Sequence, residues 1–319
     1  MNNWQKENEN KIKTLEADVL SAVTNYSDNA QDVLELLDFC NKFSNYSFAN
    51  DVLILKQRRG AQAVASFTTF KKMGYHVLKG EKAIKILLPC VYKYVKDANG
   101  KLISLKRFKG KVSEDDIETR IFFKIGNVFE VTQTDMPKEE YPKLYPNAHQ
   151  DFPSTLDEAL SDKVFTQLKQ IAEEKNIILK PISSDNEAEL NGALGCFIPS
   201  KNEIILSNKN TTTEMVDVFI HELAHGYLHN MKGKFADLPY ELKELQAEMT
   251  AYMVSKYVGI DTTEKTTNYI SGWTNNGKKF FDLNSKQRKD ILSGVTKIAN
   301  HFEDVLSKVL EENNQVKEA

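Results

Sequence analysis

Cysteine is scarce in this sequence, and the few cysteines are not arranged for disulfides or for metal binding. Only three of the 319 residues are cysteines; Cys40, Cys90 and Cys196 lie far apart, and no Cys-x-x-Cys pair occurs. An odd and scattered set argues against a disulfide framework and against a cysteine-based zinc site. We therefore expect three ordinary thiols.

Long apolar runs are also missing. No stretch approaches the roughly 20 apolar residues that a membrane-spanning helix needs. The first residues, MNNWQKENENKIK, are polar where a signal peptide would be apolar. The sequence therefore predicts a cytoplasmic protein without a membrane partner.

Charge is divided unevenly along a chain of otherwise ordinary globular composition, with 41% hydrophobic and 27% charged residues. Residues 51–112 contain fifteen Lys or Arg and three Asp or Glu, which gives +12, whereas the rest contains 27 and 42, which gives −15. A length of 319 residues favours two domains. The division of charge indicates that the two domains have different tasks.

Apolar periodicity predicts an α+β fold with two domains. Helical spacing over 15–56, with a break at residues 27–29, is followed by strand-like runs at 75–95, 101–108 and 120–131. Asn99-Gly100 between the first two runs predicts a hairpin. Four of the eight prolines cluster between residues 136 and 154, so we place the domains at 1–135 and 155–319, with a linker at 136–154.

The second half predicts a mainly helical domain with a small sheet. A helix over 156–174 precedes a strand at 177–181 and a hairpin at 195–207. A further helix begins at Thr211, which forms a capping box with Glu214. Later helices begin near Pro239 and near Ser285.

The run HELAH at residues 221–225 lies on the helix that begins at Thr211. Histidines at positions i and i+4 project from one helix face and can share a metal ion. His221 and His225 have this spacing, and Glu222 is placed to act as the general base of a zinc peptidase. His229, at i+8, lies about 12 Å along the helix from His221 and cannot share the ion with it.

A third ligand is available on the next helix, where Glu241, Glu244 and Glu248 form one polar stripe. We prefer Glu244, and Glu248 one turn later can accept the imidazole N–H of a ligand histidine. Exchanging the roles of Glu244 and Glu248 is the alternative. We expect one Zn²⁺ ion per chain, with another divalent metal as the alternative ion. Three tyrosines are further candidates for residues that assist catalysis: Tyr227, Tyr252 and Tyr269. A tyrosine is more commonly a core or surface residue without a catalytic role.

HELAHGYLH followed by ELQAEMTAY resembles the gluzincin-type zinc peptidases, particularly the ImmA/IrrE-like and ArdC-like metallopeptidase domains. The resemblance implies that two histidines and one glutamate bind the metal, and that the glutamate is the first residue of a Glu-x-x-Ala-(Asn/Glu) stretch, here Glu244. The run GIDTTEKTTNYISGW is similar to the continuation found in ArdC-like proteins of plasmids and other mobile elements.

Residues 45–87 and 122–135 resemble the single-stranded-DNA-binding domain of the same ArdC-like proteins, although Phe70 and Tyr75 stand where the family commonly has Trp and Arg. Cations that track phosphates and aromatic rings that stack on bases are typical of single-strand binding. Alternating lysines on an exposed strand can instead protect a sheet edge. The candidate DNA-binding residues are Lys56, Arg58, Arg59, Phe70, Lys71, Lys72, Tyr75, Lys79, Lys82 and Lys85.

These features favour a zinc metalloendopeptidase fused to a single-stranded-DNA-binding domain, encoded by a mobile element and acting in antirestriction or in the establishment of incoming DNA. Its partners would be single-stranded DNA and a protein or peptide substrate whose sequence is not specified. Two alternatives stay open. The first is a non-enzymatic DNA-binding protein with a structural or latent zinc site, and the second is a regulatory protease that cleaves a DNA-bound repressor.

Overall fold

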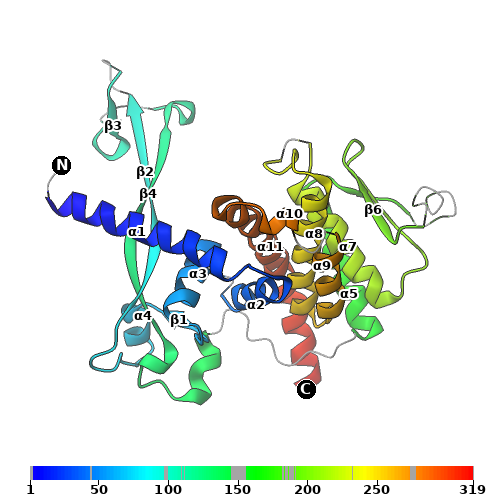
Figure 1. The fold of residues 1–319 in the computed structure, drawn as a ribbon, viewed down its shortest axis with the longest axis horizontal. Helices are drawn as coiled ribbons and strands as arrows, with labels where there is room; N and C mark the ends of the chain where they lie inside the picture. Colours follow the sequence, from blue (N-terminus) through cyan, green and yellow to red (C-terminus); the bar gives the residue numbers. More distant parts are fainter. Residues whose placement is uncertain are drawn as a thin grey trace. The chain divides into compact units, whose positions relative to one another are not determined.

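The chain forms two compact units in a computed structural model that describes residues 3–43, 45–96, 100–108, 110, 112–144, 156–181, 183, 186, 190, 192–231, 233–273 and 278–318 (Figure 1). Unit 1 comprises Met1–Val19 and Leu53–Leu144, and unit 2 comprises Leu20–Val52 and Tyr145–Ala319. Helices combine with small, mainly antiparallel sheets, so the predicted α+β class is confirmed. No helix among these described residues has the length and apolar character needed to cross a membrane.

One segment joins a different unit from the one that the sequence suggested. The helix α2 (Ala30–Asn41) belongs to unit 2 rather than to the N-terminal part of the chain. Asp38 accepts a hydrogen bond from the hydroxyl of Tyr252, and the Asn41 amide donates to the carbonyl of Met253. These partners lie 214 and 212 residues apart in the sequence, so no local pattern could reveal them.

The predicted linker is partly structured. Its first part forms a 3₁₀ helix at Lys138–Leu144, and residues 145–155, which include the rest of the linker, lie outside the described residues. The helical prediction for residues 15–56 is confirmed by α1 (Asn3–Asn25), α2 and α3 (Phe48–Gln57). The side chain of Asn29 caps α2 by accepting from the backbone N–H of Asp32.

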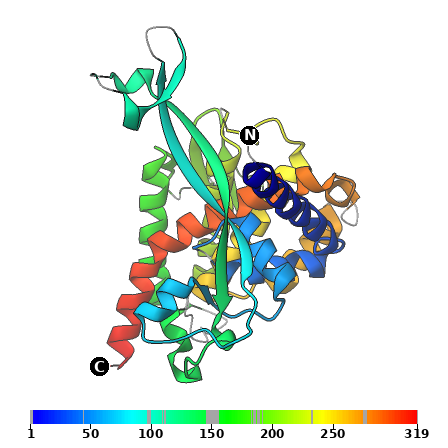
Figure 2. The same cartoon turned by 90° about the vertical axis from the view of Figure 1, so that its left-hand side faces the viewer.

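Unit 1 is built on a four-stranded antiparallel sheet with the order β1-β4-β2-β3. Its strands are β1 (Val64–Ala65), β2 (Ile84–Lys96), β3 (Leu102–Ser104) and β4 (Glu118–Glu130). The short helix α4 (Phe67–Lys72) follows β1. Figures 1 and 2 show β2 and β4 as one long twisted ribbon that projects beyond the rest of unit 1.

The predicted strand at 75–95 begins later than expected, at Ile84. Before it, the chain forms a turn in which Gly80 has a φ of 95°, a left-handed conformation that glycine adopts readily. The hairpin between β2 and β3 is confirmed by the pairing of Tyr94 with Ser104, although Asn99 lies outside the described residues.

Unit 2 combines a small sheet with packed helices. The sheet has the order β5-β7-β6, formed by β5 (Ile178–Leu179), β7 (Glu203–Leu206) and β6 (Gly195–Ile198), so β6 is an outer strand. The helix α7 (Thr212–Leu228) packs against β6, α5 (Glu158–Glu174) and α8 (Tyr240–Val258). The remaining helices are α9 (Thr263–Trp273), α10 (Lys278–Phe281) and α11 (Ser285–Glu318).

Candidate metal centre

The helix α7 holds the HELAH run in a fixed orientation. It begins with the predicted capping box, in which the Thr211 hydroxyl accepts from the Glu214 N–H and the Glu214 carboxylate accepts from the Thr211 N–H. Its apolar side is fully buried, with Phe219 and Leu223 at 0% exposure. The helix therefore cannot rotate without exposing its core face, which fixes the side from which His221 and His225 project.

The helix α8 brings Glu244 to the same place. It begins after Pro239 and ends at Gly259, whose φ of 93° terminates the helix in a left-handed turn. The small residues Ala247 and Ala251 are fully buried on α8, and α8 packs closely along α7. This approach lets a glutamate of one helix reach the histidines of the other.

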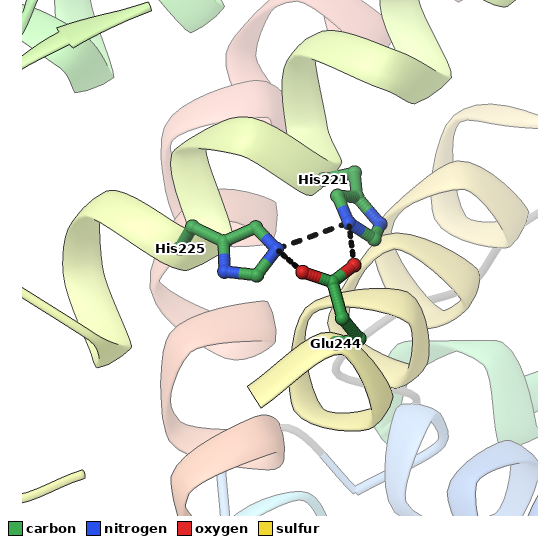
Figure 3. Close-up of side chains that lie close together, drawn as sticks. All are labelled: His221, His225 and Glu244. Atoms are coloured by element: carbon green, nitrogen blue, oxygen red, sulfur yellow. Dashed lines mark hydrogen bonds and ion pairs between the residues drawn. The ribbon is translucent and has the colours of Figure 1, made fainter. Parts of the chain in front are cut away.

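His221, His225 and Glu244 converge on one point (Figure 3). The two Nε2 atoms lie 3.1 Å apart. One carboxylate oxygen of Glu244 lies 3.5 Å from Nε2 of His221, and the other lies 3.3 Å from Nε2 of His225. One ligand atom from each residue therefore lies within 4.8 Å of the other two, a distance that a single metal ion can bridge.

The hydrogen bonds at Nδ1 of His225, on the side of the ring away from His221 and Glu244, determine the tautomer of His225. Gln246 donates through Nε2 to the carbonyl of Ile291, so its Oε1, 3.0 Å from Nε2 of His229, accepts from that imidazole. Nδ1 of His229 is then an acceptor and lies 3.0 Å from Nδ1 of His225. His225 must donate there, which leaves the lone pair of its Nε2 directed at the candidate centre.

The chemistry of the donor set fits a cation. Glu248 lies 3.4 Å from Nδ1 of His221, which leaves Nε2 of His221 to face Nε2 of His225 and the Glu244 carboxylate. Three acceptors that converge in this way repel one another unless a positive charge lies between them. Burial lowers the pKa of His221, but its hydrogen bonds to Glu244 and Glu248 outweigh this effect and raise the pKa to about 10. A proton can therefore occupy the place that a metal ion would take.

His229 is held in the neutral form that this arrangement requires. Burial, together with the nearby His225, lowers the pKa of His229 to about 3. The sequence indicated only that His229 cannot share the ion with His221. The structure adds its contacts to His225 and Gln246. The role of Gln246 could not be predicted from the sequence, because a buried glutamine on a helix cannot be distinguished there from an exposed one.

Glu248 contacts His221 from outside the group formed by His221, His225 and Glu244. Besides contacting His221, it accepts a hydrogen bond of 2.7 Å from the hydroxyl of Thr266 and lies 3.5 Å from Nζ of Lys265. Lys265 also forms an ion pair of 2.6 Å with Asp217. Glu248 is nearly fully buried and its oxygens are engaged by these partners. The geometry therefore favours Glu244 over Glu248 as the third ligand.

The side chain of Glu222 lies against the outer strand β6. A Cβ atom placed on Gly195 of β6 would lie 3.1 Å from Oε1 of Glu222 and 2.5 Å from Cγ1 of Val218. Gly195 therefore leaves the space that the Glu222 side chain needs. Among the tyrosines, Tyr269 donates to Glu244 over 2.9 Å, whereas Tyr227 and Tyr252 bond to Glu174 and Asp38 away from the ligands.

The candidate DNA-binding residues of unit 1 are less uniform than the sequence suggested. The prediction that Phe70 stacks on DNA bases is wrong, because its ring is fully buried. Three cations make contacts within the unit: Lys56 with Asp18, Arg58 with Thr132 and Glu130, and Lys85 with Asn127. Tyr75 is partly buried. The exposed candidates are Arg59, Lys71, Lys72, Lys79 and Lys82, together with Lys56 and Lys85, whose side chains make the contacts just described.

Comparison with known proteins identifies the class of the N-terminal part. Residues 4–129 match the family model described as the N-terminal domain of anti-restriction factor ArdC. The chain is also 34% identical to an uncharacterized protein, pXO2-81, of Bacillus anthracis, over 94% of this chain. It spans 52% of the length of that relative.

Two crystal structures of the antirestriction protein ArdC from plasmid R388 show a more distant likeness. The metal-free structure has a TM-score of 0.45 and 15% identity and covers 83% of this chain and 85% of that chain. The Mn(II)-bound structure has a TM-score of 0.42 and 17% identity, with 83% and 90% covered. The similarity that a family model supports is thus that of residues 4–129 to the N-terminal domain of ArdC.

Proposed function

We propose that unit 2 is a metal-dependent endopeptidase that uses a divalent ion, zinc in the first instance. The observation that carries this proposal is the convergence of three acceptors from His221, His225 and Glu244. Glu222 directly follows His221 on α7. Two histidines and one carboxylate leave a fourth position open, as catalytic zinc sites do. When bound, such an ion lowers the pKa of its water and polarises a peptide carbonyl.

Residues of the chain would supply the proton transfer, the positioning of Glu244 and the binding of the peptide. Glu222 takes the proton of the attacking water and later delivers it to the leaving amine. Tyr269 holds one oxygen of Glu244 in place through its hydroxyl. An extended peptide fits beside Glu222 by pairing with the outer strand β6, since strand addition at a sheet edge is a common way to bind peptides.

We also propose that unit 1 binds single-stranded DNA and that the whole protein acts in antirestriction or in the establishment of incoming DNA. The match to the ArdC N-terminal domain and the charge of +12 over residues 51–112 support this part. The peptide substrate stays unspecified.

Replacement of Glu222 by Gln separates chemistry from binding. Purified protein loaded with Zn²⁺ is incubated with fluorescein-labelled casein, and the metal content of each sample is measured by mass spectrometry. We expect the wild type and Glu158→Gln, a change at the exposed first turn of α5, to cleave casein. Glu222→Gln should hold one ion per chain and release no peptides. Cleavage by Glu222→Gln, or a wild type that binds no metal, would contradict the proposal.

A structural or latent metal site is the second candidate, and one observation favours it. The side chains of His221, His225 and Glu244 are each only 13% exposed, so access to the ion is narrow. Under this reading, chelation lowers the melting temperature of unit 2, the wild type cleaves neither casein nor a peptide library, and Glu222→Gln has no effect.

A further inference from the structure

The outer half of the β2–β4 ribbon exposes large side chains on both of its faces. Among the described residues, β3 pairs with β2 only at residues 94–96, and β1 pairs with β4 only at residues 129–130. Between these points, the described part of the sheet is two-stranded. Such a ribbon buries little by itself, and Val91, Tyr92, Ile121 and Phe122 are 60%, 48%, 59% and 48% exposed.

The strand register separates these side chains into two chemically different faces. Tyr92 lies opposite Arg120, and Cys90 lies opposite Phe122. Since side chains alternate along a strand, the rings of Tyr92, Tyr94 and Phe122 and most cations share one side, whereas Phe123 lies on the other. We call it the aromatic face, and it consists of Tyr92, Tyr94, Lys96, Glu118, Arg120, Phe122 and Lys124.

The opposite side, the apolar face, consists of Pro89, Val91, Ile121 and Phe123, with Lys93 beyond it toward the tip. It lacks the interleaved cations of the aromatic face. The same short ribbon therefore offers two surfaces of similar exposure, and only one of them combines rings with positive charge.

The rings of the aromatic face are arranged as separate platforms. Tyr92 and Phe122 meet edge to face, with centroids 5.7 Å apart and an interplanar angle of 75°. Arg120 lies over the ring of Tyr94 at 5.7 Å and also pairs with Glu118 over 2.6 Å. Tyr92 and Tyr94 are two residues apart, about 6.8 Å along the strand. Three cations against one carboxylate leave the face positive.

We propose that the aromatic face of the β2–β4 ribbon is the surface on which unit 1 stacks the bases of single-stranded DNA. This inference rests on the proposed DNA binding of unit 1 and assigns it to residues that the sequence did not single out. Bases of a single strand have free π faces, whereas those of a duplex are stacked on one another. Lys96, Arg120 and Lys124 on the same face supply cations that can pair with the phosphates of such a strand.

Binding of the full-length chain to a labelled oligo(dT) of about 20 nucleotides, longer than one site of ~4–16 nucleotides, tests the assignment. Fluorescence anisotropy is measured for Tyr92→Val, Phe122→Val and Arg120→Gln. The matched control is Val91→Thr with Ile121→Thr, a directly paired couple on the apolar face of the same ribbon. Circular dichroism confirms that each variant is folded.

We expect Tyr92→Val and Phe122→Val each to weaken binding by roughly five- to 150-fold, which corresponds to the loss of one stacked base. Arg120→Gln should reduce the slope of log affinity against log salt by about 0.7. The control should bind within about twofold of the wild type, and a duplex should compete poorly.

The outcomes separate the inference from the proposed function. If the wild type binds oligo(dT) and the aromatic variants bind equally well, the aromatic face is not the site, but DNA binding by unit 1 stands. Equal losses in the control, or equal competition by duplex, also refute base stacking on this face. If the wild type does not bind oligo(dT), the DNA-binding proposal fails and the inference fails with it.

Discussion

Replacement of His229 by Leu tests whether the outer hydrogen bonds prepare His225 for metal. Nδ1 of His229 accepts from Nδ1 of His225 over 3.0 Å, and His229 is only 5% exposed, so water cannot readily replace it. The change leaves a buried N–H of His225 without its acceptor, at a cost of about 1–3 kcal/mol. It also frees His225 to place its proton on Nε2, where the metal should bind.

The expected effect is a weaker metal site in a folded protein. Loss of a group that orients a ligand histidine commonly lowers metal affinity about 10–100-fold. Zn²⁺ affinity is measured by competition with a chromophoric chelator, and folding is checked by thermal unfolding of the metal-free protein.

A matched variant makes this prediction specific. His229→Asn places an amide oxygen close to the position of Nδ1, so it should keep the acceptor for His225 and restore most of the affinity. Equal affinity of the Leu variant and the wild type would refute the tautomer argument. Equal loss in the Leu and Asn variants would show that packing rather than the hydrogen bond is responsible.

Three further predictions concern the surroundings of the centre. Thr266→Val should lower the free energy of unfolding by about 1–3 kcal/mol in chemical denaturation, because it removes a donor at 2.7 Å from the buried Glu248, whereas Thr266→Ser should be close to wild type. Gly195→Ala should reduce casein cleavage more than metal content, because the new Cβ would lie 3.1 Å from Oε1 of Glu222. Unchanged cleavage would show that β6 can shift to make room for the methyl group. Saturating Zn²⁺ at about 100 times its dissociation constant should stabilise the protein by about 2.7 kcal/mol, and thermal melts with His225→Ala should show no such gain.

The sequence predicted the elements of the centre because each depends on local patterns. Thr211 and Glu214 marked the start of α7, and the spacing of His221 and His225 placed both on one face. The carboxylate partner could be narrowed to two glutamates, since both lie on one stripe of α8. The sequence favoured Glu244, and the positions of Thr266 and Lys265, which only the packing of α9 against α8 provides, add a structural reason for that preference.

Other features could not be read from the sequence because they depend on contacts between distant residues. Gln246 and Thr250 are polar but fully buried, since α8 is covered on nearly every side, and the pattern of α8 therefore has no clear apolar stripe. Phe70 resembled a surface aromatic among lysines, yet its ring packs inside unit 1. The aromatic face of the ribbon appears only when the register of β2 and β4 is known.

The most direct test of the metal centre is a crystal structure of the Zn²⁺-loaded protein with anomalous data at the zinc edge. We predict one strong peak bound by Nε2 of His221, Nε2 of His225 and a carboxylate oxygen of Glu244, each at about 2.0–2.2 Å. Glu248 should stay hydrogen-bonded to Thr266. No peak between these residues, or a zinc ion bound by Glu248 in place of Glu244, would contradict the account.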